Sequence, residues 1–330
     1  MADFSYNLLL DRILAITLFN FIHILSYFWL VLYELSLQRT WVKTNGLNFD
    51  YFHFPCGYYL GMPAAKKFIA GLLPKKCLLG VVHLPALPGA PSYGGKLDPI
   101  RQSMRRDLLA LKKGGAHAVI IENFGDAPFA ADSAGPAAVA CLTSLACEAR
   151  ELFPGPLGIN LLRNDGVGAM AVAAASGADF IRVNVLVGAR LADQGILNGI
   201  AEKLLRFRKR IGAGHIRIFS DVDVKHSAPM APGYTIEDEA RDAWERGGAD
   251  ALILSGAGTG HGTDPDHLRR AHTAAPRAPL LLGSGTTLDN LSDYLPEVSG
   301  FIVGTFLKRS GKIDSNRVRA FVRALAKAHR

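Results

Sequence analysis

Four charged residues have the types and positions that proton-transfer chemistry requires. Glu122, Asp221, Asp223 and Lys225 each lie at or just after the end of an apolar run. A carboxylate in such a place can act as a general acid or base, and a lysine there can polarise a carbonyl group, bind phosphate or form a Schiff base. We therefore predict catalytic roles for these four residues, with Glu122 as the first choice for proton transfer and Asp221 as the second.

Further polar residues follow apolar runs elsewhere in the chain. Their amide, guanidinium, carboxylate and imidazole groups suit hydrogen bonds to a polar substrate. The predicted substrate-binding residues are Asn160, Arg163, Asn164, Asp165, Arg182, Asn184 and His226. Burying this many charges is costly unless each charge is paired, so a purely structural ion network is the competing interpretation. His83 also ends an apolar run, but the sequence assigns it no role.

Three glycine-rich segments, SGAGTG (255–260), GSGTT (283–287) and VGTFLK (303–308), also follow apolar runs. Glycine has no Cβ, so the main chain can approach a ligand closely and present its N–H groups to a phosphate. The predicted phosphate-binding residues are Ser255, Gly256, Gly258, Gly283, Ser284, Gly285, Gly304 and Thr305. The alternative is that these glycines only form turns.

Metal-binding patterns are weak in this sequence. Glu122, Asp221 and Asp223 offer oxygen ligands of the kind that Mg²⁺ prefers, but the pair His261 and His267 spans a predicted loop and helix and does not suit zinc. We predict no metal and no cofactor, with Mg²⁺ as the alternative.

The candidate residues must be positioned by eight apolar runs that alternate with helical patterns after Cys77. The predicted strands are 78–83, 118–123, 157–165, 180–184, 216–226, 251–256, 279–285 and 301–305. The predicted helices are 99–113, 137–152, 166–176, 200–211, 236–246, 265–274, 288–294 and 315–329. This alternation predicts an α/β fold with a parallel sheet closed into a (β/α)8 TIM barrel. Ligands of such barrels bind at the carboxyl ends of the strands, where the candidate residues lie.

The N-terminal part of the chain differs in composition from the rest. We predict a hydrophobic extension over residues 1–61 and the barrel domain over 62–330. Residues 13–33 contain no formally charged side chain and are long enough to cross a bilayer. A membrane helix, a start codon assigned upstream of Met62 and a targeting segment are the three interpretations. A membrane helix would place the barrel on the cytoplasmic side, because basic residues follow it.

Charge and cysteine usage narrow the functional class. The net charge of +8 is dispersed apart from one dense basic run at 206–210, which lies at the end of a predicted helix, where it faces water and complements the helix dipole. No nucleic-acid-binding motif accompanies it, so we predict no nucleic-acid partner. The four cysteines form no CxxC pair, which favours a reducing compartment and hence a cytoplasmic location. Barrel helices often pair across their exposed faces, and a homo-oligomer stays an open expectation.

Eight strings spread along the barrel region carry a family resemblance. They are VVHLPALPGAP (81–91), ENFGDAPF (122–129), GINLLRND (158–165), FIRVN (180–184), SDVDVKH (220–226), SGAGTG (255–260), GSGTTLDN (283–290) and VGTFLK (303–308). Together they resemble the BtpA/SgcQ family over essentially all of 78–328. That family is similar to the ribulose-phosphate-binding barrels, which implies a phosphate site. The segment 122–129 also resembles the strand-two loop of the tryptophan synthase α subunit, whose glutamate does acid/base work, and this implies the same role for Glu122.

The resemblance leaves three kinds of function open. Photosynthetic members of the family are associated with photosystem I biogenesis as peripheral membrane proteins, whereas other members occur without a photosystem. We expect an enzyme that acts on a small phosphorylated metabolite by acid/base chemistry, of the lyase, isomerase or hydrolase class. The alternatives are a non-catalytic assembly or stability factor, with peripheral membrane association, and a phosphometabolite sensor without turnover.

Overall fold

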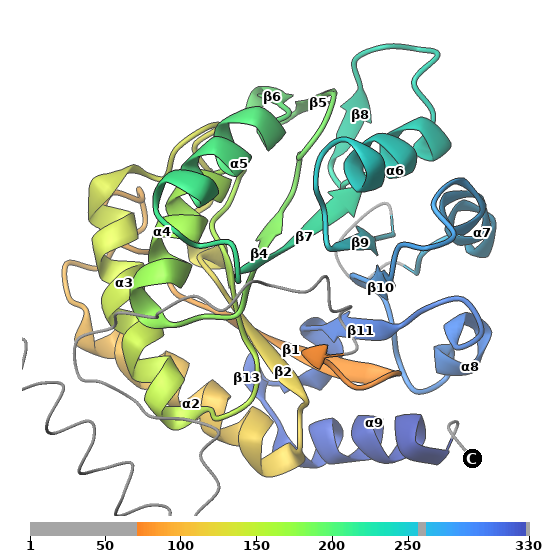
Figure 1. Cartoon of the computed structure of the whole chain (residues 1–330). Helices are drawn as coiled ribbons and strands as arrows, with labels where there is room; N and C mark the ends of the chain where they lie inside the picture. The colour runs from red at the N-terminus through yellow and green to blue at the C-terminus, as the bar shows by residue number, and fades with distance from the viewer. Residues whose placement is uncertain (1–70, 257–261, 328–330) are drawn as a thin grey trace, which may run out of the picture. The chain divides into compact units, whose positions relative to one another are not determined.

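The computed structural model describes residues 71–256 and 262–327, and within them a closed barrel of eight parallel strands forms the centre (Figure 1). The barrel strands are β1 (Cys77–His83), β2 (Ala118–Glu122), β3 (Leu157–Asn160), β4 (Phe180–Val183), β7 (Arg217–Val222), β9 (Ala251–Leu254), β10 (Leu280–Leu282) and β11 (Gly300–Val303). They follow one another around the barrel in chain order, and β11 closes it by pairing with β1. The predicted (β/α)8 TIM barrel is confirmed.

One helix follows each barrel strand, as the alternation predicts. The helices are α2 (Asp98–Gly114), α3 (Gly135–Leu152), α4 (Gly166–Ser176), α5 (Ala201–Arg210), α6 (Ile236–Glu245), α7 (Pro265–Ala274), α8 (Leu291–Tyr294) and α9 (Ser315–Lys327). Local sequence sets their ends: Thr235 and Asp238 form a capping box at the start of α6. Gly115, with φ of +86°, terminates α2 in the left-handed conformation that glycine adopts without strain.

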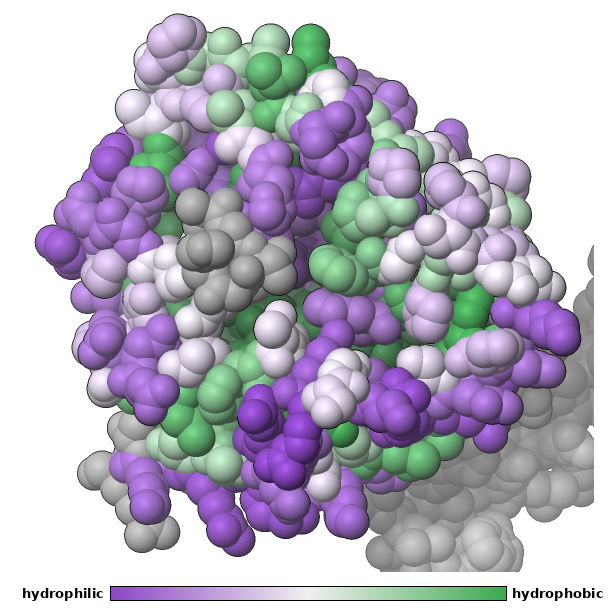
Figure 2. Space-filling model, turned by 180° about the vertical axis from the view of Figure 1, so that it is seen from behind, coloured by the Kyte–Doolittle hydropathy of each residue, from purple (hydrophilic) through white to green (hydrophobic). Residues whose placement is uncertain are grey.

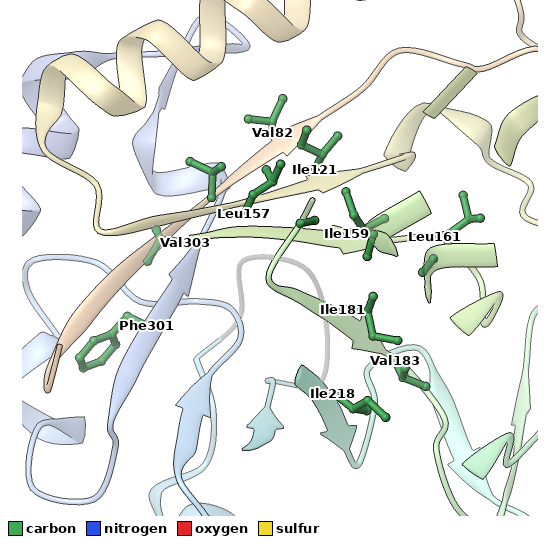
Figure 3. Close-up of a cluster of buried hydrophobic side chains, with 14 of the residues drawn as sticks. Val82, Ile121, Leu157, Ile159, Leu161, Ile181, Val183, Ile218, Phe301 and Val303 are labelled. Carbon is green, nitrogen blue, oxygen red and sulfur yellow. The ribbon is translucent and has the colours of Figure 1, made fainter. Parts of the chain in front are cut away.

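Alternation along the strands divides the core into two layers. One large cluster joins strand residues such as Val82, Ile121 and Ile181 to the surrounding helices, and Figure 3 shows part of it along neighbouring strands. A second cluster is drawn from the intervening strand positions and fills the barrel interior, where Phe180 and Phe219 stack with ring centroids 4.4 Å apart. Successive side chains of a strand point to opposite faces, so polar residues two positions after an interior residue also point inward.

Polar side chains replace apolar ones at the carboxyl end of the interior layer. His83, Glu122, Arg182 and Asp221 lie two positions after the interior residues Val81, Ile120, Phe180 and Phe219. The same parity places Asn160 at the end of β3, where it pairs with Glu122 and Arg182 in the register of the sheet. The alternation along the strands therefore brings five polar side chains together at one end of the barrel.

Strand β7 is shorter than the sequence predicts. It ends at Val222 rather than continuing to 226, because Asp223 and His226 adopt positive φ angles of +52° and +58°. The alternation by which Asp221, Asp223 and Lys225 would share one face breaks at that point. Asp223 consequently leaves the barrel interior and contacts a different part of the molecule.

Small antiparallel sheets add to the barrel and were missing from the sequence-based prediction. Strands β5 (Ala189–Ala192), β6 (Gly195–Asn198) and β8 (Ser227–Pro229) form a three-stranded sheet after β4 and β7. A two-stranded hairpin of β12 (Lys308–Arg309) and β13 (Lys312–Ile313) precedes α9, and the short 3-10 helices are η2 (Phe124–Asp126) and η3 (Thr305–Leu307). These strands are largely exposed or only partly buried, so they lack the continuous apolar runs that mark the barrel strands.

The predicted hydrophobic extension, residues 1–61, lies outside the described residues, as does the candidate membrane segment 13–33. Across 71–256 and 262–327, none of the helices combines the length and the hydrophobicity that a bilayer crossing needs.

Candidate functional site

A cavity of about 160 Å³ opens at the carboxyl ends of the barrel strands. Side chains and loops from β1, β2, β4, β7, β10 and β11 contribute to its wall. The lining residues are Val81, His83, Glu122, Phe124, Arg182, Lys225, Gly283, Ser284, Gly285, Thr286, Thr287, Ile302, Val303, Gly304, Thr305 and Phe306. Three of the predicted catalytic or substrate-binding residues and five of the predicted phosphate-binding residues are among them.

Glu122, the first choice for proton transfer, ends β2 with its side chain buried beside the cavity. Asn160 donates a hydrogen bond of 2.5 Å from Nδ2 to Glu122 Oε2, and Nη1 of Arg182 lies 3.9 Å from the same oxygen. Burial pushes the pKa of Glu122 upward, but neighbouring His83, the positive charges of Arg182 and Lys225 and the Asn160 bond outweigh it and hold that pKa below its ordinary value. The carboxylate is therefore ionised at neutral pH and able to accept a proton.

Asp221 lies behind the cavity wall rather than in it. Its carboxylate accepts hydrogen bonds of 3.0 to 3.2 Å from Nε and Nη2 of Arg182 and a further bond from Asn184 Nδ2. The side chain of Asp221 is 1% exposed, and Arg182 and Asn184 both donate to its carboxylate. This arrangement suits an anchor for Arg182, and it leaves Asp221 out of direct reach of a ligand in the cavity.

Lys225 brings a positive charge to the wall from the loop after β7. Its backbone carbonyl accepts a bond of 2.6 Å from Nη2 of Arg163, which ties this loop to the loop after β3. Burial, followed by the nearby charge of Arg182, lowers the pKa of Lys225. A cluster of Lys225, Arg182 and Arg163 around Glu122 gives this end of the barrel an excess of positive charge, which favours an anionic ligand.

The predicted phosphate-binding loop after β10 forms the opposite wall. A Cβ on Gly283 would lie 2.6 Å from both Ile253 Cγ2 and Ser255 Oγ, so only glycine allows the main chain this position. Asn290 fixes the loop, since it donates to Gly285 O at 2.9 Å and accepts from Thr287 N at 2.8 Å. The loop thus has a defined shape before any ligand binds.

Several buried polar atoms around the cavity have no hydrogen-bond partner among the described residues. On the glycine loop they are Ser284 Oγ and Thr286 Oγ1, and on the barrel floor they are Asn160 Oδ1 and Asn184 Oδ1. Buried polar groups in proteins are nearly always paired. Ser284 and Thr286 line the cavity, so their hydroxyls are placed to bind a polar ligand there.

Other predicted site residues hold loops together. Asn164 Oδ1 accepts from the N–H of Val185, and its amide donates to two backbone carbonyls. Asp165 caps α4 by accepting from Gly168 N and also binds Ser133 and Ala134.

The remaining predicted residues lie away from the cavity wall. Asp223 pairs with Arg190 at 2.6 Å in a separate hollow, and His226 is exposed. Ser255 and Gly256 are not among the residues that line the cavity, and Gly258 falls outside the described residues.

Sequence reasoning assigned no role to several residues of the site. His83 and Phe124 line the cavity with their rings stacked 4.4 Å apart, and Thr286 and Thr287 extend the glycine loop. Lys308 contacts His83 from β12. All five lie inside or at the edge of the strings that carry the family resemblance, but a lone threonine, phenylalanine or lysine has no spacing signal of its own.

Each carboxylate of the considered Mg²⁺ site has a different partner: Glu122 binds Asn160, Asp221 binds Arg182 and Asp223 binds Arg190. Across the described ranges, no three His, Cys, Asp or Glu side chains gather as a metal site would require.

Comparison with known proteins places the chain in a family. The model of the BtpA family matches residues 74–327. An uncharacterized protein of Thermococcus kodakarensis is 44% identical over 241 residues, which cover 73% of this chain and 90% of that protein. The Photosystem I biogenesis protein BtpA of Synechocystis is 41% identical over 254 residues, or 76% of this chain and 88% of that protein. Among solved structures, N-(5'-phosphoribosyl)anthranilate isomerase from Pyrococcus furiosus superposes with a TM-score of 0.46 at 14% identity, over 76% of this chain and 99% of that one. The chain belongs to the BtpA family.

Proposed function

We propose that this protein is an enzyme that acts on a small phosphorylated metabolite by acid/base chemistry at the mouth of its barrel. The observation that carries the proposal is that Glu122 and the Gly283–Thr287 loop line one and the same cavity. A proton acceptor and an anion-binding loop brought together from β2 and β10 define both ends of a substrate.

The loop end of the cavity supports binding of a phosphate group. Residues 283–287 and 304–305 border the cavity, and the hydroxyls of Ser284 and Thr286 lack partners among the described residues. The N–H groups of Gly283 and Thr287 are bonded within the protein, to Leu254 O and Asn290 Oδ1, so the proposed phosphate would bind other groups of these loops. Charge-assisted hydrogen bonds are each worth about 1.5–3 kcal/mol net. Lys225 and Arg182 add positive charge from the other side.

The strand end of the cavity supports proton transfer. Glu122 is held in one orientation by Asn160 and is ionised because His83, Arg182 and Lys225 lower its pKa. A positioned carboxylate of this kind contributes roughly 10²–10⁴-fold to a proton-transfer step.

The test is a thermal-shift screen of the full-length protein against inorganic phosphate and a panel of phosphorylated metabolites. A compound present at a hundred times its dissociation constant should stabilise the fold by about 2.7 kcal/mol. Glu122→Gln should retain this binding, because the new side chain still accepts from Asn160, but should lose turnover of any compound that the wild type converts. The proposal fails if neither phosphate nor any phosphorylated compound stabilises the wild-type protein.

A role in assembly is the second candidate, and the name of the Synechocystis relative, at 41% identity, favours it. Such a role requires a surface that binds another protein or a membrane. On the face drawn in Figure 2, hydrophobic residues lie in separate patches among hydrophilic ones. Glu122→Gln separates the two candidates in cells: an assembly factor keeps its function in this variant, whereas an enzyme loses it.

A further inference from the structure

His83 occupies a position between an acid and a base at the edge of the cavity. Its Nε2 lies 3.7 Å from Glu122 Oε1, and its Nδ1 lies 2.7 Å from Nζ of Lys308. The ring stacks on Phe124 at an interplanar angle of 17°, which fixes its plane. A Cβ on Gly304 would lie 3.3 Å from Nε2, so the glycine leaves the space beside this nitrogen open to the cavity.

The contact with Lys308 determines which ring nitrogen carries the hydrogen. A lysine ammonium can only donate, so Nδ1 of His83 accepts and Nε2 carries the hydrogen. The opposite arrangement requires a neutral Lys308. Burial lowers the pKa of Lys308, and the charges of Asp107 and Glu122 act against this lowering and favour the ammonium form. The hydrogen on Nε2 therefore points toward Glu122 and the open cavity.

The surroundings also keep the imidazole neutral. Burial lowers the pKa of His83 to about 4, and the charges of Lys308, Lys225 and Arg182 act in the same direction, whereas Glu122 opposes them. These groups come from β12, the loop after β7, β4 and β2, the elements packed around the ring. A neutral imidazole that donates from Nε2 is a hydrogen-bond donor suited to a carbonyl oxygen that gains negative charge.

We infer that His83 is a catalytic residue that donates from Nε2 to the carbonyl oxygen of the substrate, and that the substrate is a phosphorylated α-hydroxycarbonyl compound, an aldose or ketose phosphate. This inference rests on the proposed function. It follows from three groups on one cavity: a base, a donor 3.7 Å from that base and an anion-binding loop.

The chemistry balances without any further reactant. Glu122 takes a proton from the carbon next to the carbonyl, the electron pair of that C–H bond becomes the carbon–carbon double bond, and the carbonyl π pair moves to oxygen. That oxygen receives the Nε2 hydrogen bond and then its proton, while the neighbouring hydroxyl returns a proton to His83. The protonated Glu122 delivers its proton to the former carbonyl carbon, and the double bond shifts back to give the isomer.

The protonation state of His83 is tested without a substrate. Nitrogen-15 NMR of the histidine rings in the full-length protein, with His83→Gln to assign the signal, should show the Nε2–H tautomer from pH 8 down to about pH 5. A signal of the Nδ1–H tautomer, or a titration near pH 6.5, overturns the assignment of His83.

Lys308 is a positioning residue in this scheme, since it acts through His83. Lys308→Met should mix the two tautomers of His83 and raise its pKa, while inorganic phosphate still stabilises the protein. An unchanged tautomer and pKa in Lys308→Met would overturn the positioning role.

The substrate class is tested by hydrogen exchange. Aldose and ketose phosphates with three to seven carbons are incubated in D₂O with the full-length protein, and loss of the C–H signal next to the carbonyl is followed by NMR. At least one compound should exchange, and Glu122→Gln and His83→Gln should each slow it at least 100-fold. Stabilisation by a sugar phosphate with no exchange in the whole panel overturns only this inference, whereas no stabilisation by any phosphorylated compound overturns the proposed function as well.

Discussion

Arg182 and Asp221 form a two-point ion pair beneath the cavity, with Nε and Nη2 of the arginine 3.0 to 3.2 Å from the carboxylate oxygens. Neighbouring strands β4 and β7 supply the two residues, and both side chains are at least 95% buried. The pair holds the guanidinium where its Nη1 lies 3.9 Å from Glu122. Asp221 does not line the cavity, but it holds in place the positive charge of Arg182 that acts on Glu122, the proposed base.

Replacement of Asp221 by alanine should destabilise the protein by about 3–5 kcal/mol, because it leaves the buried Arg182 without its counter-charge. Urea unfolding of the full-length protein measures this loss. Glu202→Ala is the matched control, since Glu202 pairs with Arg206 on the exposed surface of α5 and its loss should leave stability almost unchanged. Equal stability of the two variants would show that the Arg182–Asp221 pair does not contribute to the stability of the fold.

The neutral state of His83 makes stability depend on pH. Its pKa is about 4 in the folded protein and near 6.5 when unfolded, so the unfolded state binds more protons between these values. Stability should therefore fall as pH drops below about 6.5, with a total loss from this group of about 3 kcal/mol near pH 4. His83→Gln has no such titration. The unfolding free energy of the wild type minus that of the variant should therefore decrease steadily from pH 7 to pH 4. A pH-independent difference contradicts the prediction.

Glu239 on α6 should make the stability of the protein change with pH in the opposite direction. Burial raises its pKa to about 7, and Arg190 only partly offsets this, so the folded state keeps a proton that the unfolded state loses near pH 4.5. Its contribution should reduce stability by up to about 3 kcal/mol as pH rises from 4.5 to beyond 7. Glu239→Gln removes this slope, and its unfolding free energy relative to wild type should increase between pH 5 and pH 8. An unchanged or falling difference would mean that Arg190 keeps Glu239 ionised at pH 5.

Much of the barrel and of its cavity could be predicted because hydrophobic alternation along a strand determines which way each side chain points. Glu122, Arg182 and Asp221 follow interior residues by two positions, and the structure places all three at one end of the barrel. The same rule failed at Asp223, since a positive φ angle after Val222 cannot be read from alternation.

The other missed features depend on contacts between segments far apart in the chain. The contact of Lys308 with His83 joins residues 225 positions apart through a two-stranded hairpin that has no periodic pattern. The sequence predicts that Asn164 and Asp165 bind a ligand, but in the structure their side chains accept hydrogen bonds from backbone N–H groups. Side-chain amides and carboxylates can bind a ligand or a backbone group equally well. The residue type alone therefore does not show which of the two roles a side chain has.

Thr286→Val should weaken phosphate binding without harming the fold. Thr286 is 2% exposed, and its Oγ1 has no partner among the described residues, so the isosteric change removes a buried polar atom and should leave stability equal or raise it by about 1 kcal/mol. Thr263→Val is the matched control, because Thr263 is 4% exposed and equally unpartnered but does not line the cavity. Calorimetric titration with inorganic phosphate should show weaker binding in Thr286→Val alone. Equal affinity in both variants would remove Thr286 from the site.

Gly304→Ala tests whether the cavity wall beside His83 must lack a side chain. The backbone at Gly304 has φ of −118°, which alanine adopts without strain, but the new Cβ would lie 3.2 Å from His83 Cε1 and 3.3 Å from Nε2. That spacing is tight by a few tenths of an ångström, so the ring or the wall must shift, and the methyl group reduces the space beside Nε2. We expect the affinity for inorganic phosphate to fall about tenfold, or about 1.4 kcal/mol, with little change in unfolding free energy. Gly94→Ala, where a Cβ would meet nothing within 4 Å, should bind phosphate as the wild type does. If Gly304→Ala also binds phosphate normally, the anion must bind away from the β11 end of the cavity, and only the loop after β10 would be left to hold it.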